Sequence, residues 1–146
     1  MAYIEATGLA KTFITSAGTR DVLRNVTLAV ERGEFLAVVG AMGSGKSTLL
    51  HLLSGLTAPD AGHVTIGGTR LEGVCREAAL VFQNHSLLPW FSALENVRLA
   101  VEAVFPEWTR TEQCDQSQRM LELVGLGNAI HRKPGQLSGG MRQRVA

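Results

Sequence analysis

The segment 40–47, GAMGSGKS, matches the pattern G-x-x-x-x-G-K-[ST]. Its glycines let the backbone curl so that successive N–H groups point inward, and a helix starting there adds the partial positive charge of its N-terminus. Lys46 then meets the outer phosphates of a nucleoside triphosphate, and the Ser47 hydroxyl coordinates Mg²⁺. The weaker alternative is a glycine-rich turn with a chance Lys-Ser. The predicted nucleotide-binding residues are Gly40, Ala41, Met42, Gly43, Ser44, Gly45, Lys46, Ser47 and Thr48.

The flanking segments fit a phosphate loop. FLAVVG, 35–40, is a continuous apolar run that predicts a strand buried on both faces, as in a parallel sheet. AALVFQ, 78–83, predicts a second strand of the same kind. A helix is expected over about 45–54, because Leu49, Leu50, Leu53 and Leu56 recur at helical spacing.

The remaining chain changes character from strands to helices. Residues 1–35 predict short antiparallel strands, with a turn at 18–21 and apolar alternation at Val26, Leu28 and Val30; a strand and turn follow in 63–71. From Asn84 onward the pattern is helical. Two capping boxes, Ser92 with Glu95 and Thr109 with Glu112, mark helix starts, and Gly125 suits a helix end.

Composition excludes several classes of protein. The chain has 146 residues, 45% of them hydrophobic, and a net charge of +1, which gives no basic footprint for nucleic acid. No apolar stretch approaches the roughly 18 residues of a membrane span, and the start lacks a signal-peptide pattern. The two cysteines and four histidines show no metal-ligand or disulfide spacing.

A second glycine motif narrows the class. LSGGM at 137–141, taken with the phosphate loop and Gln83, resembles the ATP-binding cassette (ABC) family over essentially the whole chain. The resemblance implies an α/β fold: a P-loop NTPase core of the ABC, RecA-like type with an N-terminal antiparallel β subdomain and a helical subdomain. Residues 1–146 would form one partial domain, with the C-terminal part of the family's domain missing. The β subdomain and phosphate-loop part would occupy 1–83, and the helical subdomain with the signature 84–146.

The resemblance also implies roles for residues outside the phosphate loop. Gln83 stands at the family's Q-loop, where it would be an auxiliary catalytic residue and a Mg²⁺ ligand. The alternative interpretation of Gln83 is a solvent-exposed strand end without a function. Phe13 stands where the family stacks an aromatic ring on adenine, and a core aromatic is an equal alternative. The signature would face the γ-phosphate held by a partner cassette in a head-to-tail dimer, or form an ordinary Ser-capped helix. The signature residues are Leu137, Ser138, Gly139, Gly140 and Met141.

Two local features refine the resemblance. The family commonly has a polar residue where this chain has Met42, so a hydrogen-bond donor is missing and ATP affinity is expected to be lower. The stretch VFQNHSLLPWFSALENVRLAV, 81–101, resembles importers of the nitrate/sulfonate/taurine group, and its segment NHSLLPW, 84–90, favours the nitrate-type subunits. In that family the apolar loop meets the transmembrane permease subunits, although Leu87 and Leu88 suit a core role equally well. The loop residues concerned are Leu87, Leu88, Trp90 and Phe91.

The sequence therefore predicts an ATP-binding subunit of an ABC importer. It would couple binding and hydrolysis of ATP, with Mg²⁺, to transport of a small anion such as nitrate or a sulfonate. Its partners would be a second ABC subunit and transmembrane permease subunits, with no nucleic acid, at the cytoplasmic side of the inner membrane as a peripheral protein. The alternatives are a non-catalytic nucleotide-binding fragment and a soluble ABC ATPase. No residue up to Ala146 matches the family's catalytic carboxylate, so these 146 residues are expected not to turn over ATP.

Overall fold

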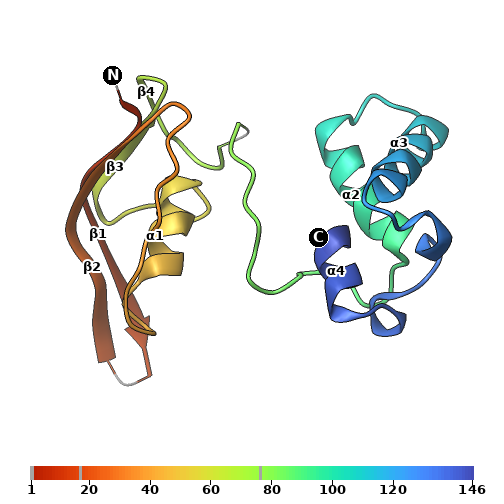
Figure 1. Ribbon diagram of the computed structural model, residues 1–146. Helices are drawn as coiled ribbons and strands as arrows, with labels where there is room; N and C mark the ends of the chain where they lie inside the picture. Colours follow the sequence, from red (N-terminus) through yellow and green to blue (C-terminus); the bar gives the residue numbers. More distant parts are fainter. Residues whose placement is uncertain (1, 17, 76) are drawn as a thin grey trace. The chain divides into compact units, whose positions relative to one another are not determined.

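A computed structural model describes residues 2–16, 18–75 and 77–146 of the chain (Figure 1). The chain divides into two compact units, Met1–Leu80 and Val81–Ala146. Strands dominate the first unit and helices the second. Each unit has its own hydrophobic core.

The first unit contains one antiparallel sheet. Its strands are β1 (Ala2–Thr15), β2 (Gly18–Glu31), β3 (Ala61–Ile66) and β4 (Thr69–Arg70), in the spatial order β2-β1-β3-β4. The predicted antiparallel sheet is confirmed, with the half-buried alternation of Val26, Leu28 and Val30 on β2. The turn predicted at 18–21 is wrong, because these residues belong to β2 and pair with residues 12–15 of β1.

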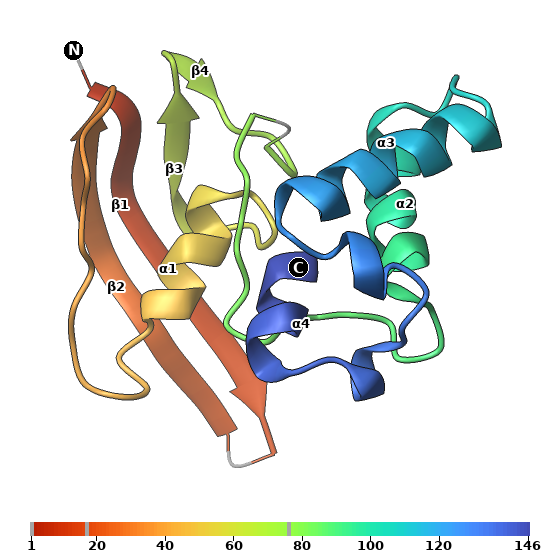
Figure 2. The same cartoon turned by 45° about the vertical axis from the view of Figure 1, so that its right-hand side comes forward.

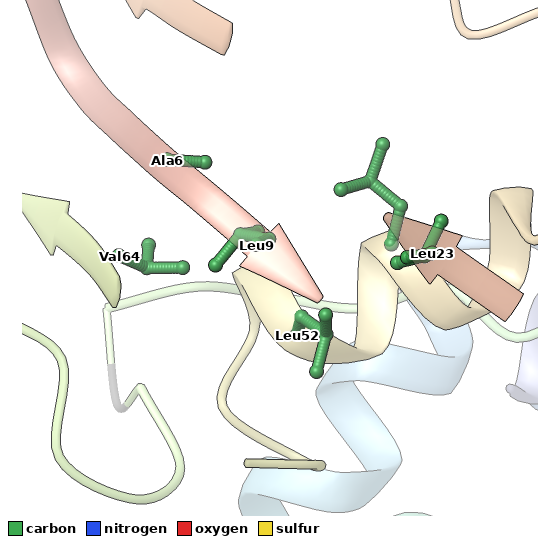
Figure 3. Close-up of a cluster of buried hydrophobic side chains, with 6 residues drawn as sticks. Ala6, Leu9, Leu23, Leu52 and Val64 are labelled. Atoms are coloured by element: carbon green, nitrogen blue, oxygen red, sulfur yellow. The ribbon is translucent and has the colours of Figure 1, made fainter. Parts of the chain in front are cut away.

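Helix α1 (Lys46–Leu53) lies along one face of this sheet in both Figure 1 and Figure 2. Leu49 and Leu52 are buried in the same apolar cluster as Leu9 and Leu23 of the hairpin. Figure 3 shows Leu52 beside Leu9 and Leu23. Burying such a side chain contributes about 1.5–3 kcal/mol, so this contact fixes the helix on the sheet. The predicted helix is confirmed, whereas Leu50, expected on the buried stripe, points outward with 46% of its surface exposed.

The two predicted parallel strands are absent. Residues 35–40 and 78–83 form no strand, and their apolar side chains are largely exposed; Phe35 keeps 92% of its surface accessible and Val81 75%. A strand needs neighbours that pair with its N–H and C=O groups. Among the residues that the structure describes, the only sheet is the antiparallel one, and neither run pairs with it. Local apolar character therefore does not suffice to make these segments strands.

The second unit is helical. It comprises α2 (Ala93–Val104), α3 (Arg110–Leu123), the short 3₁₀ turns η1 (Gly127–Ala129) and η2 (Pro134–Gln136), and α4 (Gly139–Val145). Both predicted capping boxes are present at the starts of α2 and α3. Hydrogen bonds from Ser92, chiefly from its backbone N–H, hold the pKa of Glu95 below its usual range. Hydrogen bonds from Thr109, chiefly from its hydroxyl, lower the pKa of Glu112 in the same way. Their charged forms therefore favour the folded helices.

Gly125 ends α3 as the sequence predicts. Its φ is +71°, and its N–H donates to the Glu122 carbonyl while the Leu126 N–H donates to that of Leu121. This pair of bonds is the Schellman arrangement, which needs a left-handed residue at this position. The turn carries Leu126 into the unit's core beside Leu121. None of the helices in the described part of the chain has the length and apolar character of a membrane span.

Candidate nucleotide-binding site

The phosphate loop is shaped by the way α1 begins against β2. Gly45, just before the helix, has φ +94°, a left-handed conformation that favours glycine. A Cβ on Gly45 would stand 3.0 Å from the Val22 carbonyl oxygen and 2.9 Å from Leu23 Cδ2. Glycine is therefore required at position 45 for two reasons: its positive φ and the close approach of β2.

The N-terminus of α1 is left open for an anion. No side chain caps it, and no acidic residue lies in its first turn. The first N–H groups of a helix have no intrahelical partner, so those of Lys46, Ser47 and Thr48 stay available, with the helix dipole behind them. Such an end is a ready site for a phosphate group.

Lys46 is folded back onto the loop. Its Nζ donates to the carbonyl oxygens of Gly40 at 2.9 Å and Ala41 at 2.8 Å. These bonds draw the loop around the ammonium group. An arriving phosphate would take over the same donors, which places the cation at the mouth of the anion site.

The loop and the hairpin β1–β2 line one open cavity of about 290 Å³. Gly43 and Gly45–Thr48 form its loop side, and Phe13, Arg20 and Val22 form its hairpin side. Phe13 is 40% exposed and lies outside the buried cluster, so the alternative of a core aromatic does not hold. Lys11 Nζ lies 5.7 Å from the centre of its ring. The cavity thus pairs an accessible aromatic ring with a cationic, N–H-rich loop.

Sequence reasoning missed Arg20. Its Nη2 lies 3.5 Å from the Gly43 carbonyl oxygen, so a guanidinium reaches the middle of the loop. Arg20 is paired with Phe13 across the hairpin, which sets both side chains on one face. Only the strand register reveals this, because nothing in the local pattern of 18–21 distinguishes Arg20 from a turn residue.

The predicted site residues other than Phe13 and those at 40–48 belong to the second unit. Gln83 is exposed and lies in neither helix nor strand. At the start of α4 the Ser138 hydroxyl caps the helix, accepting from the Met141 N–H at 3.3 Å. Leu137 is 4% exposed and packs in the core of the second unit.

Gly139 and Gly140 have no local reason to be glycine. Both lie in the first turn of α4 without a positive φ, and a Cβ on either would meet nothing within 4 Å. Glycine inside a helix costs about 1 kcal/mol relative to alanine. The pair therefore weakens α4 without a compensating contact among the described residues.

The apolar loop before α2 is split between core and surface. Leu87 packs against the second unit's buried cluster, whereas Trp90 is 62% exposed. Asn96 of α2 holds the loop: its Oδ1 accepts from the Leu88 N–H at 2.8 Å, and its Nδ2 donates to the carbonyl oxygens of Leu88 and Phe91 at 3.2 and 3.3 Å. Asn96, another residue that sequence reasoning missed, thus presents the Trp90 ring on an ordered loop.

The side chains that line the cavity are suited to binding an anion. Its lining holds one ammonium, one guanidinium and the hydroxyls of Ser47 and Thr48, and no carboxylate. No group of three or more His, Cys, Asp or Glu side chains in the described ranges is placed to hold a metal ion. A larger hollow of about 580 Å³ beside Cys75 and Glu77 carries none of the motif residues.

Comparisons with known proteins agree on one family. A family model described as ABC transporter matches residues 23–146. The nitrate import ATP-binding protein NrtD of Synechococcus elongatus is 47% identical over 94% of this chain and 50% of its own length. The bicarbonate transport ATP-binding protein CmpD of Synechocystis sp. is 43% identical over 99% of this chain and 51% of its own length. The chain thus spans about half the length of these curated relatives.

A solved structure shows the same fold. The dimeric structure of a post-hydrolysis state of the ATP-binding cassette MJ0796, bound to ADP and Pi, superposes with a TM-score of 0.83 at 30% identity. The match covers 97% of this chain and 66% of that one. Both units and the phosphate loop therefore have counterparts in a protein whose structure holds a nucleotide product.

The Gly45 geometry predicts a stability difference between two loop variants. Gly45→Ala should destabilise the chain by about 1–3 kcal/mol or more, since it adds strain at a positive φ to a clash with β2. Gly43→Ala is the matched control, because φ is also positive (+78°) but its Cβ would be 3.6 Å from the nearest side-chain atom. Urea unfolding of both variants measures the difference. Equal midpoints for the two would contradict the close approach of β2.

Proposed function

The chain belongs to the ABC transporter family, and on that premise we propose that it is the ATP-binding portion of an importer for a small anion such as nitrate or bicarbonate. The family resemblance predicted from the two glycine motifs is confirmed. The observation that carries the ATP-binding function is the single cavity that joins the phosphate loop to the exposed ring of Phe13. The relatives named for nitrate and bicarbonate import suggest the class of cargo.

In this site the adenine stacks on Phe13 and the phosphates reach the open N-terminus of α1. Base–aromatic stacking contributes about 1–3 kcal/mol. Lys46 leaves the Gly40 and Ala41 carbonyls and turns to the β- and γ-phosphates. Ser47 would supply one oxygen to Mg²⁺ and the phosphates would supply others, as Mg²⁺ prefers few protein ligands. With no carboxylate lining the cavity, these residues bind and orient ATP without providing a general base.

The glycine pair of α4 acts on a second copy of the domain. Two helix-weakening glycines with open space around them suit a surface that another molecule's phosphates approach at backbone distance. A head-to-tail dimer would use the signature of one cassette to close the phosphate loop of the other. The solved relative MJ0796 is described as dimeric, which supports this arrangement.

The apolar loop provides the contact with the membrane subunits. Trp90 is exposed on a loop that Asn96 orders, and an exposed, preorganised tryptophan is the kind of residue that dominates protein interfaces. Phe91 stands beside it in a T-shaped arrangement, with the ring centres 6.3 Å apart. Gln83 precedes this loop in the sequence, and its proposed role as the Q-loop residue rests on the family resemblance. On this proposal the chain lies at the cytoplasmic face of the cell membrane, held there by permease subunits.

Replacing Lys46 tests the nucleotide site. Lys46→Ala should weaken ATP binding about 10- to 100-fold, the loss expected for one or two charge-assisted hydrogen bonds. The unfolding midpoint should change little, because the ammonium contacts the loop and not the core. Titration with a fluorescent ATP analogue measures the affinity. Unchanged affinity in a folded variant would refute the site.

The signature is tested by placing a charge on α4. Gly140→Asp should leave ATP binding to the monomer intact and abolish ATP-dependent dimerisation, since like charges 4 Å apart repel by about 4 kcal/mol at an effective dielectric constant near 20. Gly140→Ala is the uncharged comparison, which separates the effect of added bulk from that of added charge; its Cβ meets nothing within 4 Å among the described residues, so this variant should fold. Size-exclusion chromatography with Mg-ATP reads the outcome. A charged variant that still dimerises would contradict the role in trans.

A further inference from the structure

We infer that Arg20 is a second phosphate-binding cation of the nucleotide site, acting beside Lys46. The inference rests on the proposed function, since it assigns a further residue to the same cavity. Arg20 lies in the strand β2, outside the phosphate-loop motif. The chemistry it would recognise is the phosphate chain of a nucleoside di- or triphosphate.

The hairpin register points Arg20 at the loop. Arg20 is the cross-strand partner of Phe13, and both side chains line the 290 Å³ cavity with Gly43 and Lys46. The guanidinium Nη2 is 3.5 Å from the Gly43 carbonyl oxygen. A hydrogen bond of that length is weak, so little is lost when the group turns from the carbonyl to a better acceptor.

Arg20 carries a charge that nothing in the described chain neutralises. The other cations on this hairpin are paired: Lys11 with Asp60 at 2.7 Å, and Arg24 with Asp21 at 2.8 Å. Among the described residues Arg20 has no ion pair, and no acidic side chain lines its cavity. An unpaired guanidinium beside an N–H-rich loop reinforces the attraction of the site for an anion.

The contacts favour phosphate over base as its ligand. The cation near the Phe13 ring is Lys11, at 5.7 Å from the ring centre, whereas Arg20 contacts the loop backbone. Guanidinium presents several donors in a planar fork that fits phosphate oxygens. The neighbouring Met42 side chain has no hydrogen to donate, so Arg20 supplies donors next to a position where the loop lacks one.

The two cations would respond to the ligand in the same way. Without phosphate, Lys46 holds the carbonyls of Gly40 and Ala41, and Arg20 reaches that of Gly43. These carbonyl contacts preorganise the loop with its donors gathered around the cavity. A phosphate chain would then exchange neutral acceptors for charged ones at both cations, and charge-assisted bonds are roughly twice as strong as neutral ones.

The test compares Arg20→Gln with Arg24→Gln in the 146-residue chain, using ATP, ADP and adenosine as ligands. Arg24 is the matched control: it is an exposed arginine of the same strand that pairs with Asp21 and does not line the cavity. Arg20→Gln should weaken ATP binding about tenfold, as expected for one charge-assisted hydrogen bond, and flatten its dependence on salt. Adenosine binding should not change, Arg20→Lys should recover part of the ATP affinity, and Arg24→Gln should match wild type for every ligand.

Three other outcomes would overturn the inference, each for a different reason. Equal ATP affinity in Arg20→Gln and Arg24→Gln would remove Arg20 from the site while leaving the proposed function intact. An equal loss for adenosine and ATP would assign the guanidinium to the base and not to the phosphates. Equal ATP affinity in the wild type and in Lys46→Ala would refute the proposed function and the inference together.

Discussion

The site depends on the contact between Gly45 and strand β2. A residue with φ +94° turns the loop into α1, and only a hydrogen in place of a side chain lets that turn lie against the Val22 carbonyl. The apolar cluster beneath, with Leu23, Leu49 and Leu52, holds the helix in that position. Because of this contact, the uncapped N–H groups of α1 face the hairpin that carries Phe13 and Arg20. Loop, helix and aromatic ring line one pocket, the proposed nucleotide site, because of this single close approach.

The two glycine motifs of the chain use backbone donors in different ways. In the phosphate loop the glycines are required by the chain's own geometry, as the clash at Gly45 shows. At the start of α4, Ser138 caps the helix and Gly139 and Gly140 have open space around them. A residue that lowers helix stability and has no compensating contact among the described residues is best explained by a surface outside the chain. This contrast is the physical basis for proposing that the second motif serves a partner cassette.

Features that depend on neighbours in sequence were predictable. The phosphate loop, the extent of α1, and the capping boxes of Ser92 and Thr109 are all set within a few residues, and the structure contains them. Features that depend on distant pairing were not. The run around Phe35 is apolar enough for a buried strand, yet no described strand pairs with it, so it lies exposed. Arg20 escaped notice for the same reason, since its place opposite Phe13 follows from an irregular hairpin register with several shifts along β1.

Hydrogen exchange of the chain with and without Mg-ATP, followed by mass spectrometry, tests the central claim most directly. The phosphates should occupy the N–H groups at the start of α1, and the base should cover the hairpin next to the loop. The account predicts slower exchange in peptides that cover 43–48 and 12–21 when Mg-ATP is present, with little change in α3. Exchange at 43–48 that is the same with and without saturating Mg-ATP would contradict a nucleotide site at this loop.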